Sequence, residues 1–218
     1  MAPLLGYWKI RGLAQSIRLL LEYTGEEYNE KYYELGNDFN RDDWLNEKFS
    51  LGLSFPNLPY LIDGDLKLTQ SSAILRYLAE KHNMVGETSE ERARTMMLAE
   101  EVQDLRMGFA RLCYNPDFAN LKHEYLSQLP SRLKLFSDFI GTKHWLMGEK
   151  LTYPDFHFYD MLDSLKILSP TCLDEFDNLK NYLENFEKLE PIAKYMKSDK
   201  YIQKPLNNKV VKFGGDCH

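Results

Sequence analysis

Residues 55–68 read FPNLPYLIDGDLKL, and this stretch decides the fold of the first part of the chain. Two strand-like apolar runs flank Asp63 and Gly64. An Asp-Gly pair between such runs is a strong signal for a β-hairpin, because both residues tolerate the positive φ angles of a tight turn. Pro59 stands directly before the first run. The sequence therefore predicts a β-hairpin that starts just after Pro59.

The residues before the hairpin predict a strand, a helix and a second strand. Residues 4–7 form a short apolar run that suits a buried strand. Apolar side chains then recur at helical spacing over residues 13–21, and Gly25 ends this helix. Residues 28–33 alternate as a second strand does, and an irregular stretch over residues 36–43 follows.

A further helix is predicted directly after the hairpin. Residues 70–72 (Gln-Ser-Ser) supply a helix start, and apolar side chains on one face continue to about Asn83. The order up to this point is βαβ followed by ββα, which resembles the order of thioredoxin-like domains. In that fold a cis-proline precedes the third strand, and Pro59 occupies this position. We therefore expect residues 1–83 to form a thioredoxin-like domain that is able to bind a ligand.

The rest of the sequence predicts helices only. Residues 84–90 are expected to form a linker, and residues 88–91 (TSEE) match a capping box that opens a long helix to about Tyr114. A second capping signature stands at residues 152–155 (TYPD). The predicted fold class is α/β plus all-α: an N-terminal thioredoxin-like domain followed by an all-helical C-terminal domain over residues 91–218.

Composition and charge favour a packed globular protein that binds neither nucleic acid nor membranes. The 218 residues are 44% hydrophobic and 28% charged, which is sufficient for a packed core. The formal net charge of -6 disfavours nucleic acid and anionic membranes, because both bind clustered Lys and Arg. The start of the sequence shows no basic segment followed by a long apolar stretch, and no apolar run is long enough to cross a bilayer.

Cysteine and histidine usage argues against disulfides and metal sites. Cys113, Cys172 and Cys217 are odd in number and widely spaced, and no Cys-x-x-Cys motif occurs. None of the five histidines makes a metal-ligand pair at helical spacing. We therefore expect buried or incidental thiols, no metal, and a reducing, cytoplasmic location.

Six motifs follow one another along the chain: LGYWKIRGL at 5–13, IRLLLEY at 17–23, WLNEKF at 44–49, FPNLPY at 55–60, LTQS at 68–71 and LCYNPDF at 112–118. In order and spacing they resemble mu-class glutathione S-transferases, and the resemblance covers essentially the whole chain. It implies a detoxifying enzyme that joins the glutathione thiolate to hydrophobic electrophiles. It also implies a homodimer, with glutathione as co-substrate and no metal or redox cofactor.

The resemblance assigns the central catalytic role to Tyr7. A free thiol has a pKa of about 8.5, so little glutathione is thiolate at neutral pH. A hydrogen bond donated to the sulfur favours the thiolate and lowers that pKa. Tyr7 lies at the end of the first predicted strand, where its hydroxyl can project into a site. A core or strand tyrosine without chemistry is the alternative.

The resemblance also implies the other glutathione-binding residues. Besides Tyr7 they are Trp8, Leu13, Arg41, Trp44, Lys48, Asn57, Leu58, Gln70 and Ser71, with Asp104 contributed by the partner subunit. Ser71 stands at a predicted helix N-terminus, where backbone N–H groups suit the γ-glutamyl carboxylate. Asn57 and Leu58 would offer backbone groups to the cysteinyl peptide. Trp44 and Lys48, four residues apart, would bind the glycyl end.

Three of these assignments have plain structural alternatives. Ser71 also suits an ordinary helix cap, and Lys48 and Asp104 suit surface charges. Phe55 resembles the aromatic side chain that mu-class subunits insert into their partner, although it could instead belong to the core.

The electrophile site implied by the resemblance contains Ile10, Met107, Ala110, Arg111 and Tyr114. Tyr114 resembles a family residue that assists the reaction as an electrophile. A pocket of Ile, Met and Tyr side chains accepts many hydrophobic shapes. The loop at 36–43 and the tail at 207–218 depart from the family pattern, and both would border this pocket. Two alternatives therefore stay open: a ligandin-like protein that carries hydrophobic ligands, and a glutathione-dependent isomerase or peroxidase.

Overall fold

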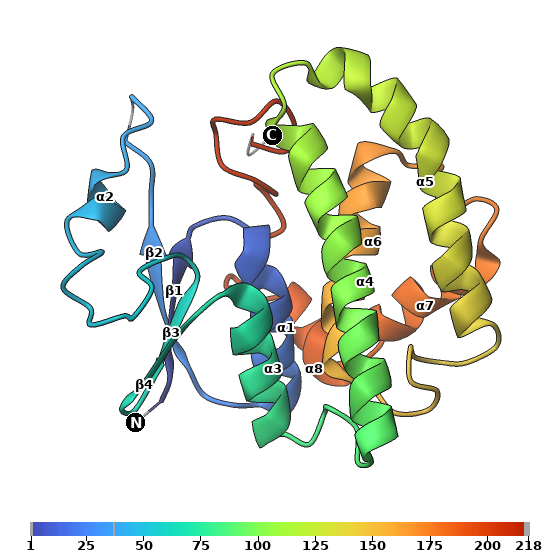
Figure 1. The fold of residues 1–218 in the computed structure, drawn as a ribbon, viewed down its shortest axis with the longest axis horizontal. Helices are drawn as coiled ribbons and strands as arrows, with labels where there is room; N and C mark the ends of the chain where they lie inside the picture. The colour runs from blue at the N-terminus through green and yellow to red at the C-terminus, as the bar shows by residue number, and fades with distance from the viewer. Residues whose placement is uncertain (1, 37, 216–218) are drawn as a thin grey trace.

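The computed structural model describes residues 2–36 and 38–215, and its first part is built on a four-stranded sheet (Figure 1). The strands are β1 (Leu4–Trp8), β2 (Asn29–Tyr33), β3 (Tyr60–Asp63) and β4 (Leu66–Thr69). They lie in the order β2-β1-β3-β4. β1 runs parallel to β2 and antiparallel to β3, and β3 pairs with β4 as an antiparallel hairpin.

The predicted hairpin is confirmed. Its two-residue turn consists of Gly64, which has a φ of 61°, and Asp65. This is one position later than the predicted Asp63–Gly64 pair, because Asp63 still pairs with Leu66 in the sheet. The peptide bond between Leu58 and Pro59 is cis, as the sequence order predicts. The thioredoxin-like arrangement of the sheet is therefore confirmed as well.

Two helices cover one face of the sheet and lie between it and the helical part of the chain (Figure 1). They are α1 (Gln15–Thr24), which follows a short 3-10 turn η1 (Gly12–Ala14), and α3 (Ser71–Lys81). Gly25 ends α1 with a φ of 69° and bonds to the Leu21 carbonyl, as predicted. The short helix α2 (Asp42–Leu45) lies across the sheet from them.

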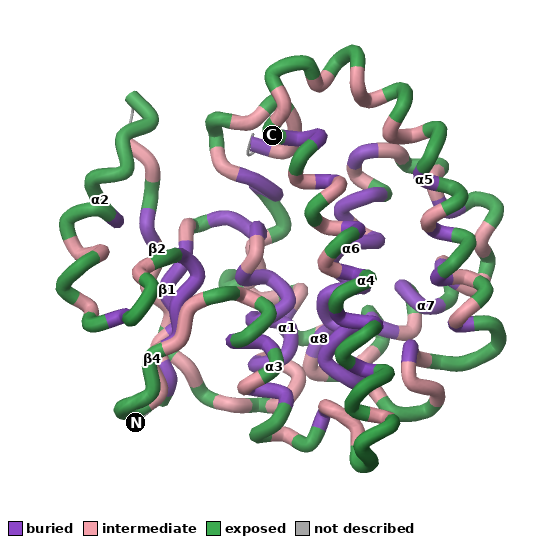
Figure 2. Tube along the Cα trace, in the orientation of Figure 1, coloured by how far each residue is buried: buried purple, intermediate pink, exposed green. Residues whose placement is uncertain are grey.

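The second part is all-helical, as expected. It contains α4 (Ser89–Tyr114), α5 (Phe118–Ile140), α6 (Tyr153–Leu168), α7 (Asp177–Glu187) and α8 (Glu190–Met196). Helix α4 begins inside the segment 84–90 that was expected to be a linker. Helix α6 is buried along most of its length and packs against both α1 and α4 (Figure 2).

Both predicted capping boxes are present. Thr88 and Glu91 cap α4, and Thr152 and Asp155 cap α6. Asp155 is fully buried, and its carboxylate accepts hydrogen bonds from the backbone N–H groups of Thr152 (2.8 Å) and Leu146 (2.9 Å). The cap therefore also fixes the loop before α6.

The C-terminal segment returns to the end of β1. The backbone N–H groups of Arg11 and Gly12 donate to the carbonyls of Pro205 (2.9 Å) and Leu206 (3.0 Å). Farther along, the Lys212 N–H donates to the Cys113 carbonyl at 2.9 Å. The segment just before the tail is thus tied to the turn after β1, and the tail at 207–218 is tied to the end of α4.

Cys113 is buried and Cys172 is half-buried, and both are free thiols. Cys217 and the last residues of the tail, 216–218, lie outside the described residues. Within residues 2–36 and 38–215, the search for a helix long and apolar enough to cross a membrane finds none.

Candidate active site

Tyr7 lies near the end of β1 and is held by the turn that follows the strand. Its side chain is 5% exposed, and its hydroxyl oxygen accepts a hydrogen bond from the Leu13 N–H at 3.0 Å. A Cβ atom at Gly12 would lie 2.5 Å from this oxygen, and Gly12 has a φ of 46°. Only glycine fits this position without displacing the Tyr7 side chain, so Gly12 allows the turn to pack directly against Tyr7.

The electrostatic surroundings keep the Tyr7 hydroxyl protonated. Burial raises the pKa of Tyr7, while the Leu13 N–H and the positive charge of Arg106 oppose that rise. Because the Leu13 N–H occupies a lone pair of the oxygen, the O–H proton is left for a second acceptor. The group can therefore donate a hydrogen bond to an anion such as a thiolate.

The N-terminus of α3 lies next to this turn, since Leu13, Ser71 and Arg106 line one small cavity. Gln70 precedes the helix with a φ of 72°, and its side chain forms no cap bond. The first N–H groups of a helix lack intrahelical partners and attract anions. A carboxylate could therefore bind at Ser71, beside the Tyr7 turn.

Asn57 and Leu58 lie before the cis-proline, as predicted. In this structure the Leu58 N–H already donates to the Asn57 side-chain oxygen at 2.9 Å. A ligand that uses this N–H has to displace the Asn57 side chain.

The residues expected at the glycyl end lie in and around α2. Trp44 is 5% exposed and stacks on Tyr60, with ring centroids 6.1 Å apart. Lys48 lies one turn farther along, since its N–H bonds to the Trp44 carbonyl at 2.9 Å. Arg41 directly precedes the helix and is exposed. The Trp44 ring is thus mainly a core group, with little surface left for a ligand.

The side chain of Trp8, the last residue of β1, is half-buried. Its ring meets that of Tyr33 edge-on, with centroids 6.4 Å apart.

The structure does not bring the residues expected at the electrophile site into one cavity. Ile10 is buried and lines a cavity of about 340 Å³ whose other walls include Tyr201, Pro205 and Asn208 of the C-terminal segment. Arg111 lines a different cavity of about 210 Å³ that is bordered by residues of α4 and α5. Met107 and Tyr114 on α4 are 38% and 46% exposed.

Ala110 lies between Met107 and Tyr114 in the sequence of α4 and is half-buried. On the same helix, Asp104 is exposed. Phe55, in the loop before β3, has 78% of its surface exposed, so it is not a core residue of this chain.

Sequence reasoning missed Arg106, Pro205 and Leu206. Arg106 reaches from α4 to the Gly12 carbonyl and to Asp160 of α6. Its position among the other charged residues of α4 gave no signal for this role, because spacing alone does not distinguish a buried arginine from a surface one. The contacts of Pro205 and Leu206 are made through backbone groups, which any sequence could supply.

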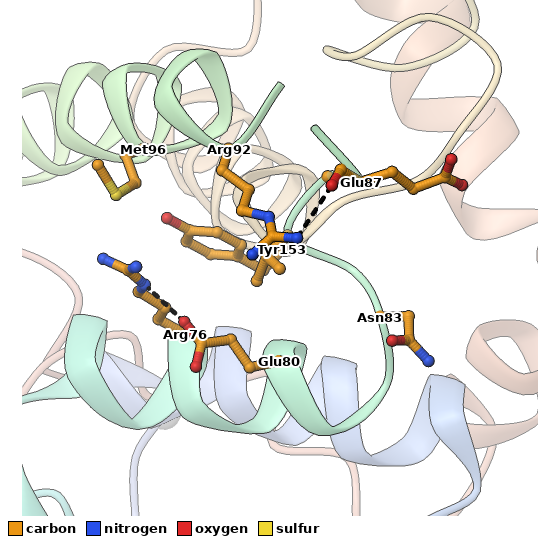
Figure 3. Close-up of a pocket in the computed structure, with 9 residues that line it drawn as sticks. Arg76, Glu80, Asn83, Glu87, Arg92, Met96 and Tyr153 are labelled. Atoms are coloured by element: carbon orange, nitrogen blue, oxygen red, sulfur yellow. Dashed lines mark hydrogen bonds and ion pairs between the residues drawn. The ribbon is translucent and has the colours of Figure 1, made fainter. Parts of the chain in front are cut away.

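Another cavity, of about 500 Å³, lies between α3 and α4 (Figure 3). Arg76 and Glu80 line it from α3 and pair with each other at 3.1 Å. Arg92 enters from α4 and donates to the Glu87 carbonyl at 2.9 Å. No residue of the Tyr7 turn lines it, and its arginines already have partners within the chain. We assign it no chemistry.

Comparison with known proteins agrees with this geometry. The family model described as Glutathione S-transferase, N-terminal domain, matches residues 3–80, and the model described as Glutathione S-transferase, C-terminal domain, matches residues 103–199. Glutathione S-transferase Mu 2 of Macaca fascicularis is 55% identical over 212 residues, which cover 96% of this chain and 97% of the relative. Glutathione S-transferase Mu 4 of Mus musculus is 56% identical with the same coverage.

Solved structures agree as well. The glutathione S-transferase Blo t 8 superposes with a TM-score of 0.90 at 33% identity, covering 97% of this chain and 99% of its own. The Pi-class glutathione S-transferase of Onchocerca volvulus gives a TM-score of 0.86 at 31% identity, covering 97% of this chain and 100% of its own. The two curated relatives named above are both Mu glutathione S-transferases, and the chain therefore belongs to the glutathione S-transferase family.

Proposed function

We propose that this transferase conjugates glutathione to hydrophobic electrophiles and that Tyr7 holds the glutathione sulfur as a thiolate. The observation that carries the proposal is the Tyr7 hydroxyl, which accepts a bond from the Leu13 N–H and keeps its own proton for a second partner. In the reaction the sulfur forms a bond to an electrophilic carbon. The leaving group departs with the electron pair of the broken bond.

We propose that the rest of glutathione binds along the line from α3 to α2. Its γ-glutamyl carboxylate would bind at Gln70 and Ser71, where the helix N-terminus lacks a side-chain cap. Its cysteinyl peptide would contact Asn57 and Leu58, once the Asn57 side chain releases the Leu58 N–H. The glycyl end would bind near Trp44, Lys48 and Arg41, and Trp8 and Leu13 would border the sulfur.

The electrophile is proposed to bind between the sulfur and α4. Ile10, Met107, Ala110, Arg111 and Tyr114 would form its walls, together with the tail segment. The Tyr114 hydroxyl supports an assisting role, because burial raises its pKa and keeps it a proton donor. No metal or redox cofactor takes part in this proposal, in which glutathione is a co-substrate.

We further propose a homodimer in a reducing, cytoplasmic location. The exposed Phe55 ring supports the dimer, since a partner would remove an apolar side chain from water. Asp104 would then reach the partner's glutathione. The free thiols of Cys113 and Cys172 support a reducing location. We propose domain boundaries at residues 1–83, 84–90 and 91–218.

A steady-state assay tests the reaction. The protein is incubated with glutathione and a panel that contains an aryl halide, an epoxide, a hydroperoxide and an isomerisable ketone. We expect thioether products from the aryl halide or the epoxide. Turnover of the hydroperoxide or the ketone alone would support the peroxidase or isomerase alternative. Tight binding of the panel without any turnover would support the ligandin-like alternative.

Sedimentation tests the dimer. Phe55→Ala should shift the protein toward monomer at micromolar concentration, without a matching loss of folding stability. Phe49→Ala is the matched control, because Phe49 is 79% exposed and is not assigned to the interface. A wild-type monomer, or equal effects of the two variants, would contradict the assignment of Phe55.

A further inference from the structure

Arg106 and Tyr7 contact the two ends of one peptide unit. The Arg106 guanidinium donates a hydrogen bond to the Gly12 carbonyl. The Leu13 N–H, which belongs to the same peptide, donates to the Tyr7 hydroxyl at 3.0 Å. In a trans peptide the C=O and N–H groups point in opposite directions. The arginine, the peptide and the tyrosine oxygen therefore form one continuous chain of hydrogen bonds.

Arg106 is itself fixed by a buried carboxylate. Its side chain is 12% exposed, and it pairs with Asp160, which is 1% exposed, at 2.8 Å. The other oxygen of Asp160 pairs with Arg11 at 2.6 Å. Arg11 directly precedes Gly12, so Asp160 of α6 holds the Tyr7 turn from two sides.

We propose that Arg106 is a positioning residue for Tyr7: through the Gly12–Leu13 peptide it orients and polarises the N–H that holds the catalytic hydroxyl. The inference rests on the proposed role of Tyr7 in holding the thiolate. A cation on the carbonyl withdraws electron density from the peptide, which makes the Leu13 N–H a stronger donor. A stronger bond to the Tyr7 oxygen in turn makes the Tyr7 O–H a stronger donor to sulfur. Arg106 needs no contact with glutathione for this effect.

The charged groups around Tyr7 support the positioning role proposed for Arg106. The groups that affect Tyr7 electrostatically are Arg106, Tyr114 and Arg18. Arg18 donates to the Ile10 and Arg11 carbonyls, but the N–H groups of those two peptides donate to Pro205 and Leu206 rather than to Tyr7. Burial raises the pKa of Tyr114, which keeps it neutral. Arg106 is therefore the cation that acts on Tyr7 through a bonded path.

The groups that face Arg106 are Asp160, His157, Cys113, Tyr7 and Tyr114. Burial, aided by Arg106, lowers the pKa of His157 to about 3, and burial raises the pKa of Cys113 to about 12. Both side chains are neutral between these values. Burial raises the pKa of Asp160, but Arg11 and Arg106 lower it further than burial raises it, so this carboxylate stays charged.

A double-mutant cycle on the full chain tests the inference. The pKa of the bound glutathione thiol is measured from thiolate absorbance against pH, with glutathione at saturation. The variants are Arg106→Leu, Tyr7→Phe and the two combined. Arg94→Leu is the matched control, because Arg94 lies on the same helix and pairs with exposed Glu90 at 2.8 Å.

We expect Arg106→Leu to raise the thiol pKa by roughly 0.3 to 1 unit, and to slow conjugation about two- to tenfold below that pKa. In the Tyr7→Phe background the same change should add nothing, because the hydroxyl through which it acts is gone. Arg106→Lys, whose ammonium can donate to the same carbonyl, should recover part of the shift. Arg94→Leu should leave the titration as in the wild type.

Two results would overturn the inference. An unchanged thiol pKa in Arg106→Leu would show that the peptide needs no cation. An equal shift with and without the Tyr7 hydroxyl would show that Arg106 acts on the sulfur directly. If Arg106→Leu does not fold, Arg106→Gln replaces it in the same cycle with the same outcomes. A Tyr7→Phe variant with a wild-type titration would instead refute the proposed role of Tyr7, so the two failures are distinguishable.

Discussion

The two sides of the active site are built in different ways. The thiol side is interior: Tyr7, its turn, Arg106 and Asp160 are joined by hydrogen bonds and hidden from water. On the electrophile side, Met107 and Tyr114 project from α4 with a third to a half of their surface exposed. The first side draws on both parts of the chain, whereas the second is a helix surface bordered by the tail.

Because of this difference, we expect thiol activation and substrate range to depend on different residues. A buried polar network is costly to alter, because each lost partner leaves a buried group unsatisfied. Exposed side chains on a helix surface are exchanged at little cost in stability. We therefore expect changes on the thiol side to affect stability and thiol activation, and changes on the electrophile side to affect only which substrates react.

The largest expected effect comes from breaking the thiol side at Asp160. Asp160→Ala leaves the buried cations of Arg11 and Arg106 without their shared partner, and should lower the free energy of unfolding by about 3–5 kcal/mol. Denaturant titration measures this change. Asp138→Ala is the control: Asp138 forms an exposed pair with Lys134, and its loss should cost under about 1 kcal/mol. Equal effects of the two variants would contradict the account of a buried network.

A smaller effect is expected from His157, which also lies on the thiol side. Burial, aided by Arg106, lowers the pKa of His157 to about 3. In the unfolded chain this group has a pKa of about 6.5. Between about pH 6.5 and 3 the unfolded chain therefore binds a proton that the folded chain does not bind. The folded state therefore loses stability as the pH falls from about 6.5 toward 3.

His157→Gln removes this titration. Between about pH 7.5 and 5, the wild type should lose about 2 kcal/mol more unfolding free energy than the variant. Denaturant midpoints at the two pH values measure the difference. Parallel losses in both proteins would show that His157 is free to take up a proton in the folded state.

The smallest effect is expected on the electrophile side. Met107→Ala should change the ratio of kcat/KM for a bulky and a compact electrophile by roughly two- to tenfold, because it removes only part of an exposed wall. The pKa of the bound thiol should stay as in the wild type. A shift in that pKa would show that the two sides are not separate.

Much of the fold could be predicted, because its signals are local. The hairpin turn after Asp63, the helix end at Gly25 and both capping boxes depend on residues a few positions apart. The capping box at 88–91 also located the start of α4 at Ser89, which lies inside the segment 84–90 that was expected to be a linker.

The site was less accessible from sequence. Motifs indicated Tyr7 and Ser71, and the structure places the turn that holds Tyr7 beside the N-terminus of α3. It also shows two features that no motif reveals: the Leu58 N–H is already bonded to Asn57, and the Trp44 ring is largely buried. Arg106 could not be identified, because its role depends on a carbonyl 94 positions away in the chain.

The most direct test of the account is the titration of the bound glutathione thiol in Tyr7→Phe. The variant keeps the ring and loses one hydrogen bond to a charged sulfur, which contributes about 1.5–3 kcal/mol. The thiol pKa should therefore rise by roughly one to two units, and the rate at neutral pH should fall about 10- to 100-fold. Because the enzyme lowers the thiol pKa, its advantage is greatest below the pKa of free glutathione, and the variant should recover as the pH rises. Identical thiolate titration curves for the wild type and Tyr7→Phe would contradict the account and assign Tyr7 a purely structural role.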